Sequence, residues 1–505
     1  MKEWLLDILS YHENEPLLFS QFYFWGFFAI VLIGYSFIYK KNTLRNAYLF
    51  AASLFFYYKS GGYFFSLLIL TIVIDYCVGL MLGKNMSTRK RRGWITISIV
   101  ANLGVLAYFK YAYFFTDVLN SLFGTSYRVQ NILALWSNQW TGTHFDVSTI
   151  ILPVGISFYT FQSMSYTIDV YRKKIKPVNN FIDFAFYVTF FPQLVAGPIV
   201  RASEFIPQLY QKYSLSRQEF SHALLLILNG LLKKIVVSDF ISINFVDRVF
   251  DNPSAFSGVE NLMAIYGYAA QIYCDFSGYT DIAIGVAMLL GFRLPINFNV
   301  PYKATNITDF WRRWHISLSS WLRDYLYISL GGNRKGKVRQ YINLMITMLL
   351  GGLWHGANLR FVIWGGIHGI ALMFHKWIKQ LHFNVPINKT WGKAISIFIT
   401  FNFVCLTWVF FRAHSMHDAS IMFSQIFTSF HSEVLPLFIK AEPLVFALIW
   451  LTFIIHWLPS SIKEKCRGYF IQTPLWVKIC YTIMVIFILY QLKSSNIQPF
   501  IYFQF

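Results

Sequence analysis

The chain has 505 residues, of which 56% are hydrophobic and only 13% are charged. This composition excludes an ordinary soluble globular protein and indicates a polytopic membrane protein. The formal net charge is +20, but Lys and Arg fall mainly in short loops between apolar stretches. That pattern follows the positive-inside rule, and it indicates contact with anionic lipid rather than binding to nucleic acid.

Cysteine spacing and the start of the chain exclude two further interpretations. The first apolar run begins near Leu18, after Glu13 and Glu15, so we expect a first span rather than a removed signal peptide. We predict neither a disulfide framework nor a metal site, since CxxC and HExxH spacings are absent from the sequence. The cysteines are scattered at Cys77, Cys274, Cys405, Cys466 and Cys480.

Alternating apolar stretches and basic loops predict the spans of the first part of the chain. The basic run 84–92 marks a loop on the cytoplasmic side, so the acidic N-terminus is expected outside. A loop with little basic charge follows at 117–147 and is expected outside. Predicted spans lie at 19–39, 46–58, 63–82, 94–115 and 150–171.

The stretch FIDFAFYVTFFPQLVAGPIVR, residues 181–201, has basic residues on both flanks. A segment with cytoplasmic markers at both ends should enter and leave the membrane by the same face. Pro192, Gly197 and Pro198 would interrupt a helix there. We therefore predict a re-entrant element that lines a cavity, where protein or water satisfies the non-helical backbone.

The second part of the chain continues the alternation to the C-terminus. The charge pattern predicts about 12 crossings plus the re-entrant element, with both termini outside. We expect an all-α polytopic bundle that forms one membrane-embedded domain over residues 1–505. Further predicted spans lie at 221–237, 262–290, 342–354, 361–377, 395–411, 444–458 and 476–492.

An amphipathic helix is predicted over residues 308–328, because apolar residues recur there at three- and four-residue spacing. Arg312, Arg313 and Arg323 lie mostly elsewhere around the helix. The pattern fits an anchor helix at the cytoplasmic interface. It equally fits a site where the arginines bind an anionic donor, such as the phosphates of coenzyme A or an acidic carrier protein.

Two histidines, His315 and His355, are candidates for chemistry. His355 ends an apolar run that contains Gly351 and Gly352, and glycines allow another group to approach the backbone closely. We expect His315 on the cytoplasmic side and His355 across the following span. A single histidine is usually structural, although an ionisable residue within a span is a functional candidate.

Two other function classes, a hydrolase and a proton-coupled transporter, fit the sequence to different degrees. A hydrolase with a nucleophile elbow is not indicated, because GxSxG is absent from the sequence. A proton-coupled transporter stays open as an alternative. Asp75, Asp275 and Asp281 are intramembrane carboxylates of the kind that transporters use.

Several motifs together resemble one family. They are DFWRRWHISLSSWLRDYLYISLGGNRKG, GGLWHGA, FFPQLVAGPIVR, YCDFSGYTDIAIG and the ending PFIYFQF. The combination resembles the membrane-bound O-acyltransferase family, in particular its bacterial branch of alginate and peptidoglycan O-acetyltransferase membrane subunits. The resemblance covers about residues 153–369 and returns at the C-terminus. It implies a core near residues 150–410, followed by a last span and aromatic tail at 474–505.

The resemblance implies interfacial helices and a tunnel open to both faces. A cytoplasmic thioester, acetyl-CoA or an acyl-carrier thioester, would supply an acyl group, expected to be acetyl, and no bound cofactor is expected. His355 matches the family's catalytic histidine and His315 its second polar position. A neutral imidazole can accept the proton of an attacking hydroxyl at cellular pH. We expect the tunnel wall to include Gln193, Pro198, Asp275, Tyr279, Trp354 and Asn358.

The tail PFIYFQF resembles the aromatic motif of D-alanyl transfer systems, where a small partner protein can supply it. Tyr502 is accordingly a candidate acyl relay, and an interfacial aromatic anchor is the alternative. The resemblance further implies the bacterial cytoplasmic (inner) membrane and an SGNH-like extracytoplasmic acyltransferase partner. The acceptor would be a cell-envelope polysaccharide such as alginate or peptidoglycan, with D-alanyl transfer to a teichoic acid as the alternative.

Overall fold

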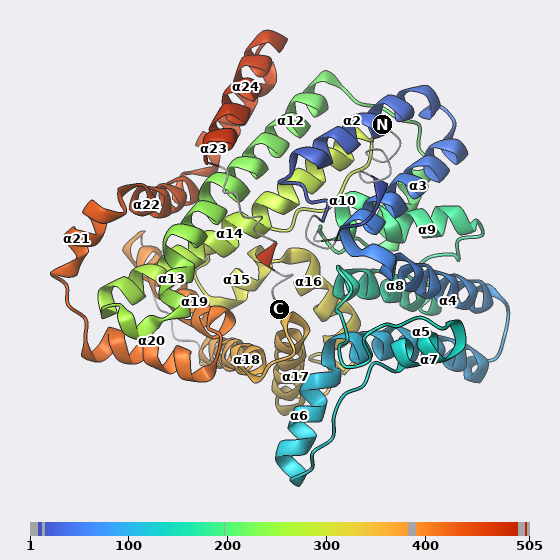
Figure 1. Ribbon diagram of the computed structural model, residues 1–505, viewed down its shortest axis with the longest axis horizontal. Helices are drawn as coiled ribbons and strands as arrows, with labels where there is room; N and C mark the ends of the chain where they lie inside the picture. Colours follow the sequence, from blue (N-terminus) through green and yellow to red (C-terminus); the bar gives the residue numbers. More distant parts are fainter. Residues whose placement is uncertain (1–8, 13–15, 196, 382–389, 493–499, 502–505) are drawn as a thin grey trace.

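The computed structural model describes residues 9–12, 16–195, 197–381, 390–492 and 500–501. Within these ranges the chain forms helices joined by loops, without strands. The predicted all-α class is therefore confirmed. Helices surround the middle of the molecule, and the described residues 500–501 lie there rather than at the edge (Figure 1).

The N-terminal part forms helices that pack on one side of the molecule (Figure 1). One π-helical turn, η2, interrupts the run between α5 and α6. The elements are α2 (Phe22–Ile38), α3 (Asn42–Gly61), η1 (Gly62–Phe64), α4 (Phe65–Gly83), α5 (Thr88–Leu106), η2 (Ala107–Tyr111), α6 (Ala112–Phe123), α7 (Ile132–Thr141) and α8 (Ile156–Tyr171).

The predicted interruption in residues 181–201 is present. Helix α9 (Phe181–Thr189) ends before Phe190, and only the short α10 (Phe191–Leu194), with Pro192 in its first turn, follows. The described residues of this segment are buried throughout, apart from its first two residues and Arg201 at its end. An interrupted backbone surrounded by protein is the environment that a re-entrant element requires.

Helix α14 (Gly258–Leu289) runs through the centre of the molecule beside α12 (Arg217–Leu231) (Figure 1). Ser257 and Glu260 form a capping box that starts α14. The two helices approach closely, because a Cβ at Gly278 would lie 2.7 Å from the carbonyl oxygen of Gly230. The glycines therefore fix the position of the central helix.

The chain also forms short elements before and after the central helix α14. They are α11 (Ala202–Phe205), η3 (Ile206–Tyr210), η4 (Leu232–Asp239), η5 (Ser242–Val246), α13 (Asp247–Asp251), η6 (Pro253–Ala255) and η7 (Pro301–Lys303). The later helices are α17 (Lys337–His355), α18 (Leu359–Gln380), α19 (Thr390–Arg412), α20 (Met416–Thr428), α21 (Val434–Ala441), α22 (Pro443–Trp457), α23 (Ser460–Gln472) and α24 (Leu475–Leu492).

The single amphipathic helix predicted over 308–328 is wrong. The structure has α15 (Ile307–Arg313), α16 (Ile316–Trp321) and the π-helix η8 (Leu322–Tyr327). The break falls at His315, whose φ is +43°. Backbone hydrogen bonds from Asn299 to the Arg313 carbonyl and from Ile316 to the Asn297 carbonyl, both 2.9 Å, replace the intrahelical ones.

By length and composition, five described helical segments are able to cross a membrane, or six if the bent pair α21–α22 is one span. They include the α3–α4 and α5–α6 segments and α18, α19 and α24. Large apolar side chains are exposed on the perimeter, for example Phe37 at 83% and Tyr490 at 79%. The chain is therefore a multi-pass membrane protein, while the count of about 12 crossings stays a prediction.

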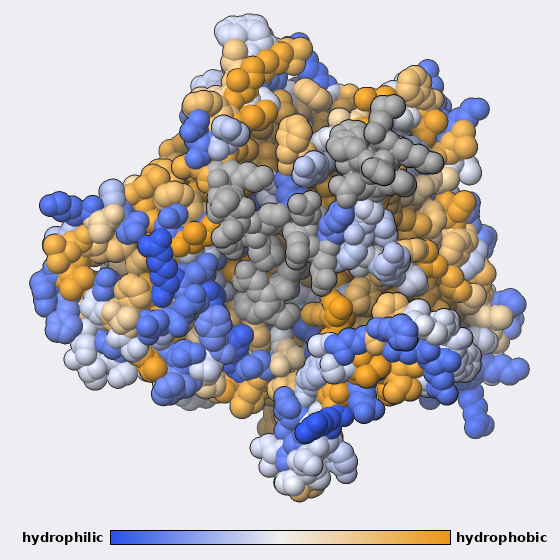
Figure 2. All heavy atoms as spheres, in the orientation of Figure 1, coloured by the Kyte–Doolittle hydropathy of each residue, from blue (hydrophilic) through white to orange (hydrophobic). Residues whose placement is uncertain are grey.

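One face of the molecule shows both apolar and polar regions (Figure 2). Orange side chains extend along the right edge, and blue side chains gather on the left over α13 and α20. Polar contacts link α13 to the chain between α19 and α20: Arg412, the last residue of α19, contacts Asp247 at 2.7 Å, and His414 in the following loop contacts Asp251 at 2.8 Å. Such a charged region belongs outside the hydrocarbon layer.

Candidate active site

His355 is the last residue of α17, and Gly356 leaves the helix with extended backbone. The carbonyls at this helix end receive hydrogen bonds from η2, about 240 residues away in sequence. Lys110 Nζ donates to the carbonyls of Trp354 at 2.9 Å and His355 at 3.1 Å, and Tyr111 Oη donates to that of Leu353 at 3.0 Å. The last turn of a helix normally leaves such carbonyls without partners. These bonds therefore hold the end of α17, and with it His355, in place.

The glycines before His355 serve helix packing as well as access. The backbone of Gly352 lies against the Phe361 carbonyl of α18, without room for a Cβ. Gly351 instead lines a cavity. Close approach of α17 and α18 therefore fixes one side of the site, and the cavity opens on the other.

His315 is completely buried, at 0% exposure. Its Nδ1 lies 3.1 Å from Asn297 Oδ1, which also accepts hydrogen bonds from the Ser317 backbone at 3.1 Å and the Ser317 hydroxyl at 3.0 Å. Asn297 therefore orients the His315 ring and stabilises the break between α15 and α16.

The two histidine rings lie together, with centroids 6.5 Å apart. Our expectation that they occupy opposite sides of a span is wrong, because the break at His315 turns its side chain into the interior. Trp354 contacts both rings, at 5.0 Å from His355 and 6.0 Å from His315. Phe276 packs edge-on against His315 at 4.6 Å. The histidines thus share one aromatic-walled site.

His355 lines two of the described cavities. The larger has a volume of about 410 Å³ and extends from His355 to Arg312, Arg323 and Lys376. The smaller has a volume of about 90 Å³ and is lined by His355, Trp354 and Lys110, among others. Because His355 lines both cavities, its side chain stands where a group in one could meet a group in the other.

The three predicted donor-binding arginines divide between two places. Arg312 and Arg323 line the larger cavity. Arg313 lies in a different cavity and pairs with Asp309 at 2.9 Å. The half-buried Lys376 also lines the larger cavity, and sequence analysis missed it. The sequence feature that could have identified Lys376 is its place as a cation in the last turns of the predicted span 361–377.

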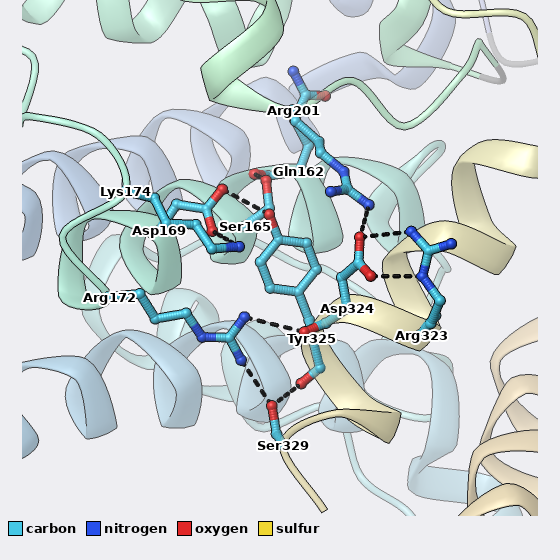
Figure 3. A network of polar contacts seen from close by, with 10 residues as sticks. All are labelled: Gln162, Ser165, Asp169, Arg172, Lys174, Arg201, Arg323, Asp324, Tyr325 and Ser329. Atoms are coloured by element: carbon cyan, nitrogen blue, oxygen red, sulfur yellow. Dashed lines mark hydrogen bonds and ion pairs between the residues drawn. The ribbon is translucent and has the colours of Figure 1, made fainter. Parts of the chain in front are cut away.

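Figure 3 shows how Arg323 is held at the rim. Asp324 accepts hydrogen bonds from Arg323 Nε at 2.7 Å and from Arg201 Nη2 at 2.6 Å. Burial alone would raise the pKa of the Asp324 carboxyl, but the hydrogen bonds from Arg323 and then Arg201 lower it below its ordinary value. In the same network Tyr325 donates to Asp169 at 2.7 Å. The Arg323 side chain is nevertheless 64% exposed, so it can contact a ligand.

The predicted tunnel-lining residues differ in position. Trp354 lines the smaller cavity. Gln193 is buried and donates to the Tyr187 carbonyl at 2.6 Å, and Pro198, five residues later, is also buried. Asn358 is exposed and caps α18 by accepting from the Arg360 backbone at 3.1 Å. The described linings of the two histidine cavities do not include Gln193, Pro198 or Asn358.

Asp275 and Tyr279 on α14 hold the C-terminal segment instead. Asp275 Oδ2 accepts the backbone N–H of Ile501 at 2.8 Å, and Asp275 Oδ1 pairs with Lys234 at 2.6 Å. The Phe500 ring lies 4.9 Å from Tyr279 and 5.4 Å from Phe276, which in turn contacts His315. The tail therefore docks one ring away from the histidines. Tyr502 lies outside the described residues.

Lys110 and Asn297 are the other residues that sequence analysis missed. A lysine within the predicted span 94–115 is itself a signal of function, since a charge at membrane depth needs a purpose. Asn297 offered no comparable signal, because its role depends on contact with His315 and Ser317.

Comparison with known proteins identifies the family of this chain. The sequence pattern described as MBOAT, the membrane-bound O-acyltransferase family, matches residues 105–417, which is more than half of the chain. The chain belongs to this family. It is an O-acyltransferase, and the family match includes η2 as well as both histidines.

Curated relatives of this O-acyltransferase share much of its length. A peptidoglycan O-acetyltransferase of Helicobacter pylori is 37% identical over 449 residues, which cover 82% of this chain and 80% of the relative. A probable alginate O-acetylase AlgI of Pseudomonas aeruginosa is 40% identical over 413 residues, covering 82% and 75%. A teichoic acid D-alanyltransferase of Bacillus subtilis is 29% identical over 291 residues, covering 54% and 72%.

Proposed function

We propose that this chain moves an acetyl group from a cytoplasmic thioester across the membrane for O-acetylation of a cell-envelope polysaccharide. The position of His355 between two cavities carries the proposal. Relatives named as peptidoglycan and alginate O-acetyltransferases support this acceptor class. The chain would lie in the bacterial cytoplasmic membrane with both termini outside.

The larger cavity is proposed to receive the donor. Its cations Arg312, Arg323 and Lys376 belong to the basic segments expected on the cytoplasmic side. Arginine forks bind phosphate through paired hydrogen bonds, and lysine adds a point charge. Acetyl-CoA and an acyl-carrier thioester both present such phosphates, and the thioester end would reach His355 through the apolar part of the cavity.

The proposed reaction uses His355 as general base. Its imidazole accepts the proton of an acceptor hydroxyl, whose oxygen forms a bond to the thioester carbonyl carbon. The carbon–sulfur bond then breaks, and the departing sulfur takes the proton from the imidazolium. A thioester is already activated, so the protein mainly positions the groups. His315, oriented by Asn297, would hold the second polar position beside the reacting carbonyl.

The smaller cavity is proposed to admit the acceptor hydroxyl. That hydroxyl would belong to the polysaccharide, to an SGNH-like extracytoplasmic partner, or to Tyr502 as a relay. Docking of Phe500 and Ile501 beside Phe276 supports the relay, because Tyr502 follows directly in sequence. The same tail and the teichoic acid D-alanyltransferase relative favour D-alanyl transfer as the second candidate reaction.

The proposal is tested with purified full-length protein, acetyl-labelled acetyl-CoA or acetylated carrier protein, and alginate or peptidoglycan fragments. We expect labelled ester on the fragments or on the protein itself with wild type and with His417→Ala, an exposed histidine on α20. We expect the initial rate of labelling by His355→Ala to be about a hundredfold or more lower, at equal yield of folded protein. Equal labelling by both variants would remove His355 from the reaction, and solute uptake that survives in His355→Ala would favour a transporter.

A further inference from the structure

A third cavity, of about 660 Å³, lies apart from the two that His355 lines. It is formed by η7, α15, the first half of α19 and the end of α22. Lys303, Arg313 and Lys393 line it together with one carboxylate, Asp309. The acyl-transfer site described above leaves this cavity without a role.

The cations of this cavity exceed its described carboxylates. Arg313 pairs with Asp309 at 2.9 Å, but Lys303 Nζ donates to a neutral group, the Leu458 carbonyl, at 2.7 Å. Behind it, Lys463 Nζ donates to the His456 carbonyl at 2.9 Å. Burial, and then the like charges of Lys393 and Arg313, lower the pKa of Lys303. An anion in the cavity would relieve this repulsion.

One face of α19 changes from charged to apolar along this cavity. Lys393, Ile397 and Phe401 lie four residues apart and all line it, so they follow one side of the helix for about 12 Å. Phe398, beside them, is 68% exposed. Helix α19 is long and apolar enough to cross a membrane. The cavity therefore joins a cationic end to an apolar wall at the start of a span.

We propose that this cavity binds an anionic phospholipid, with its phosphate among Lys303, Arg313 and Lys393 and its acyl chains along Ile397 and Phe398. Basic pockets between spans on the cytoplasmic side suit anionic headgroups. The contributing loops are the basic ones that the positive-inside rule assigns to that side. A free phosphate would satisfy the cations but would leave the exposed apolar wall uncovered, so a lipid fits both features.

Native mass spectrometry of the full-length protein tests the proposal. The protein is released from nanodiscs that contain equal amounts of phosphatidylglycerol and phosphatidylcholine, and the retained lipids are counted. We expect wild type to keep phosphatidylglycerol in preference to phosphatidylcholine. Lys303→Met with Lys393→Met should reduce that retention about tenfold or more, since each basic residue contributes near the membrane surface.

The matched control is Lys465→Met, which removes an exposed cation of α23 outside the cavity and should leave retention unchanged. Lys393→Met alone tests the cavity without changing Lys303, whose loss could disturb the end of α22. Equal retention of both lipids by wild type would overturn the proposal, as would equal retention by Lys393→Met and Lys465→Met. Displacement of the lipid by millimolar pyrophosphate would identify a simple phosphate site and contradict it as well.

Discussion

The two cavities beside His355 differ in size, charge and origin. The larger one, about 410 Å³, carries Arg312, Arg323 and Lys376 and comes from residues 308–376. The smaller one, about 90 Å³, joins Lys110, residues 152–158 and the end of α17. One can hold an extended anionic group, whereas the other has room for little more than a hydroxyl and an acyl group.

Under the proposed function, this difference assigns one role to each cavity. The cations of the larger cavity would bind the charged donor, while the small volume of the other cavity would limit which groups can approach His355. The charged donor would then stay in the larger cavity, and only the small transferred group would pass the imidazole. Variants that affect one cavity and spare the other can therefore test this assignment.

His355→Ala should have the largest effect, because His355 belongs to both cavities. We expect kcat to fall by about a hundredfold to ten-thousandfold, the usual contribution of a general base. Labelled donor binding, measured separately by filter retention, should change little because the cations remain. Normal turnover would show that the two cavities are connected by another group.

Asp275→Ala should affect the tail side and spare donor binding. The substitution removes one of two carboxylates that pair with Lys234, which keeps Asp239 at 2.8 Å, and leaves the buried N–H of Ile501 without its acceptor. The free energy of unfolding is expected to fall by about 2 to 3 kcal/mol. Thermal unfolding and protease release of a C-terminal tag measure the loss of stability and the undocking of the tail. Asp281→Ala, which breaks the more exposed pair with Lys233, is the control and should lose about 1 kcal/mol. Equal effects in both variants would contradict a docked tail.

Lys110→Met should lower kcat about tenfold and leave the donor KM unchanged, because the end of α17 loses its cation but the larger cavity stays intact. Lys110→Arg should restore most of the rate, since a guanidinium can donate to the same carbonyls. Initial rates at varied donor concentration separate the two constants. A raised KM with unchanged kcat would place Lys110 with the donor instead.

Arg312→Gln should have the smallest effect and should change only the KM for the donor. We expect KM for the donor to rise about fivefold with kcat nearly unchanged, as for loss of one charge-assisted contact. Arg313→Gln is the matched control, since its side chain lies in the cavity proposed for lipid. Assays in neutral detergent should show an unchanged KM for that control. Equal shifts in both variants would remove the distinction between the two arginines.

Sequence analysis predicted the helical membrane fold because that fold depends on local patterns, and the donor side that it predicted stays a prediction. The basic segment, the glycines and His355 all lie within residues 309–358. It placed His315 wrongly, because the left-handed turn at that residue depends on Asn297, 18 residues earlier. The support of α17 by Lys110 was likewise out of reach, since it joins residues 245 positions apart. A contact between two distant segments produces no periodic pattern in the sequence of either segment.

Transfer between sealed compartments tests the central claim most directly. Protein is reconstituted in one orientation in liposomes, with acetyl-labelled thioester on the side of Arg312 and Lys376 and the hydroxyl acceptor on the other side. The account predicts labelled acceptor while the donor thiol stays in its own compartment, and labelling about a hundredfold or more slower with His355→Ala. Label that appears only when donor and acceptor share a compartment would contradict passage between the two cavities.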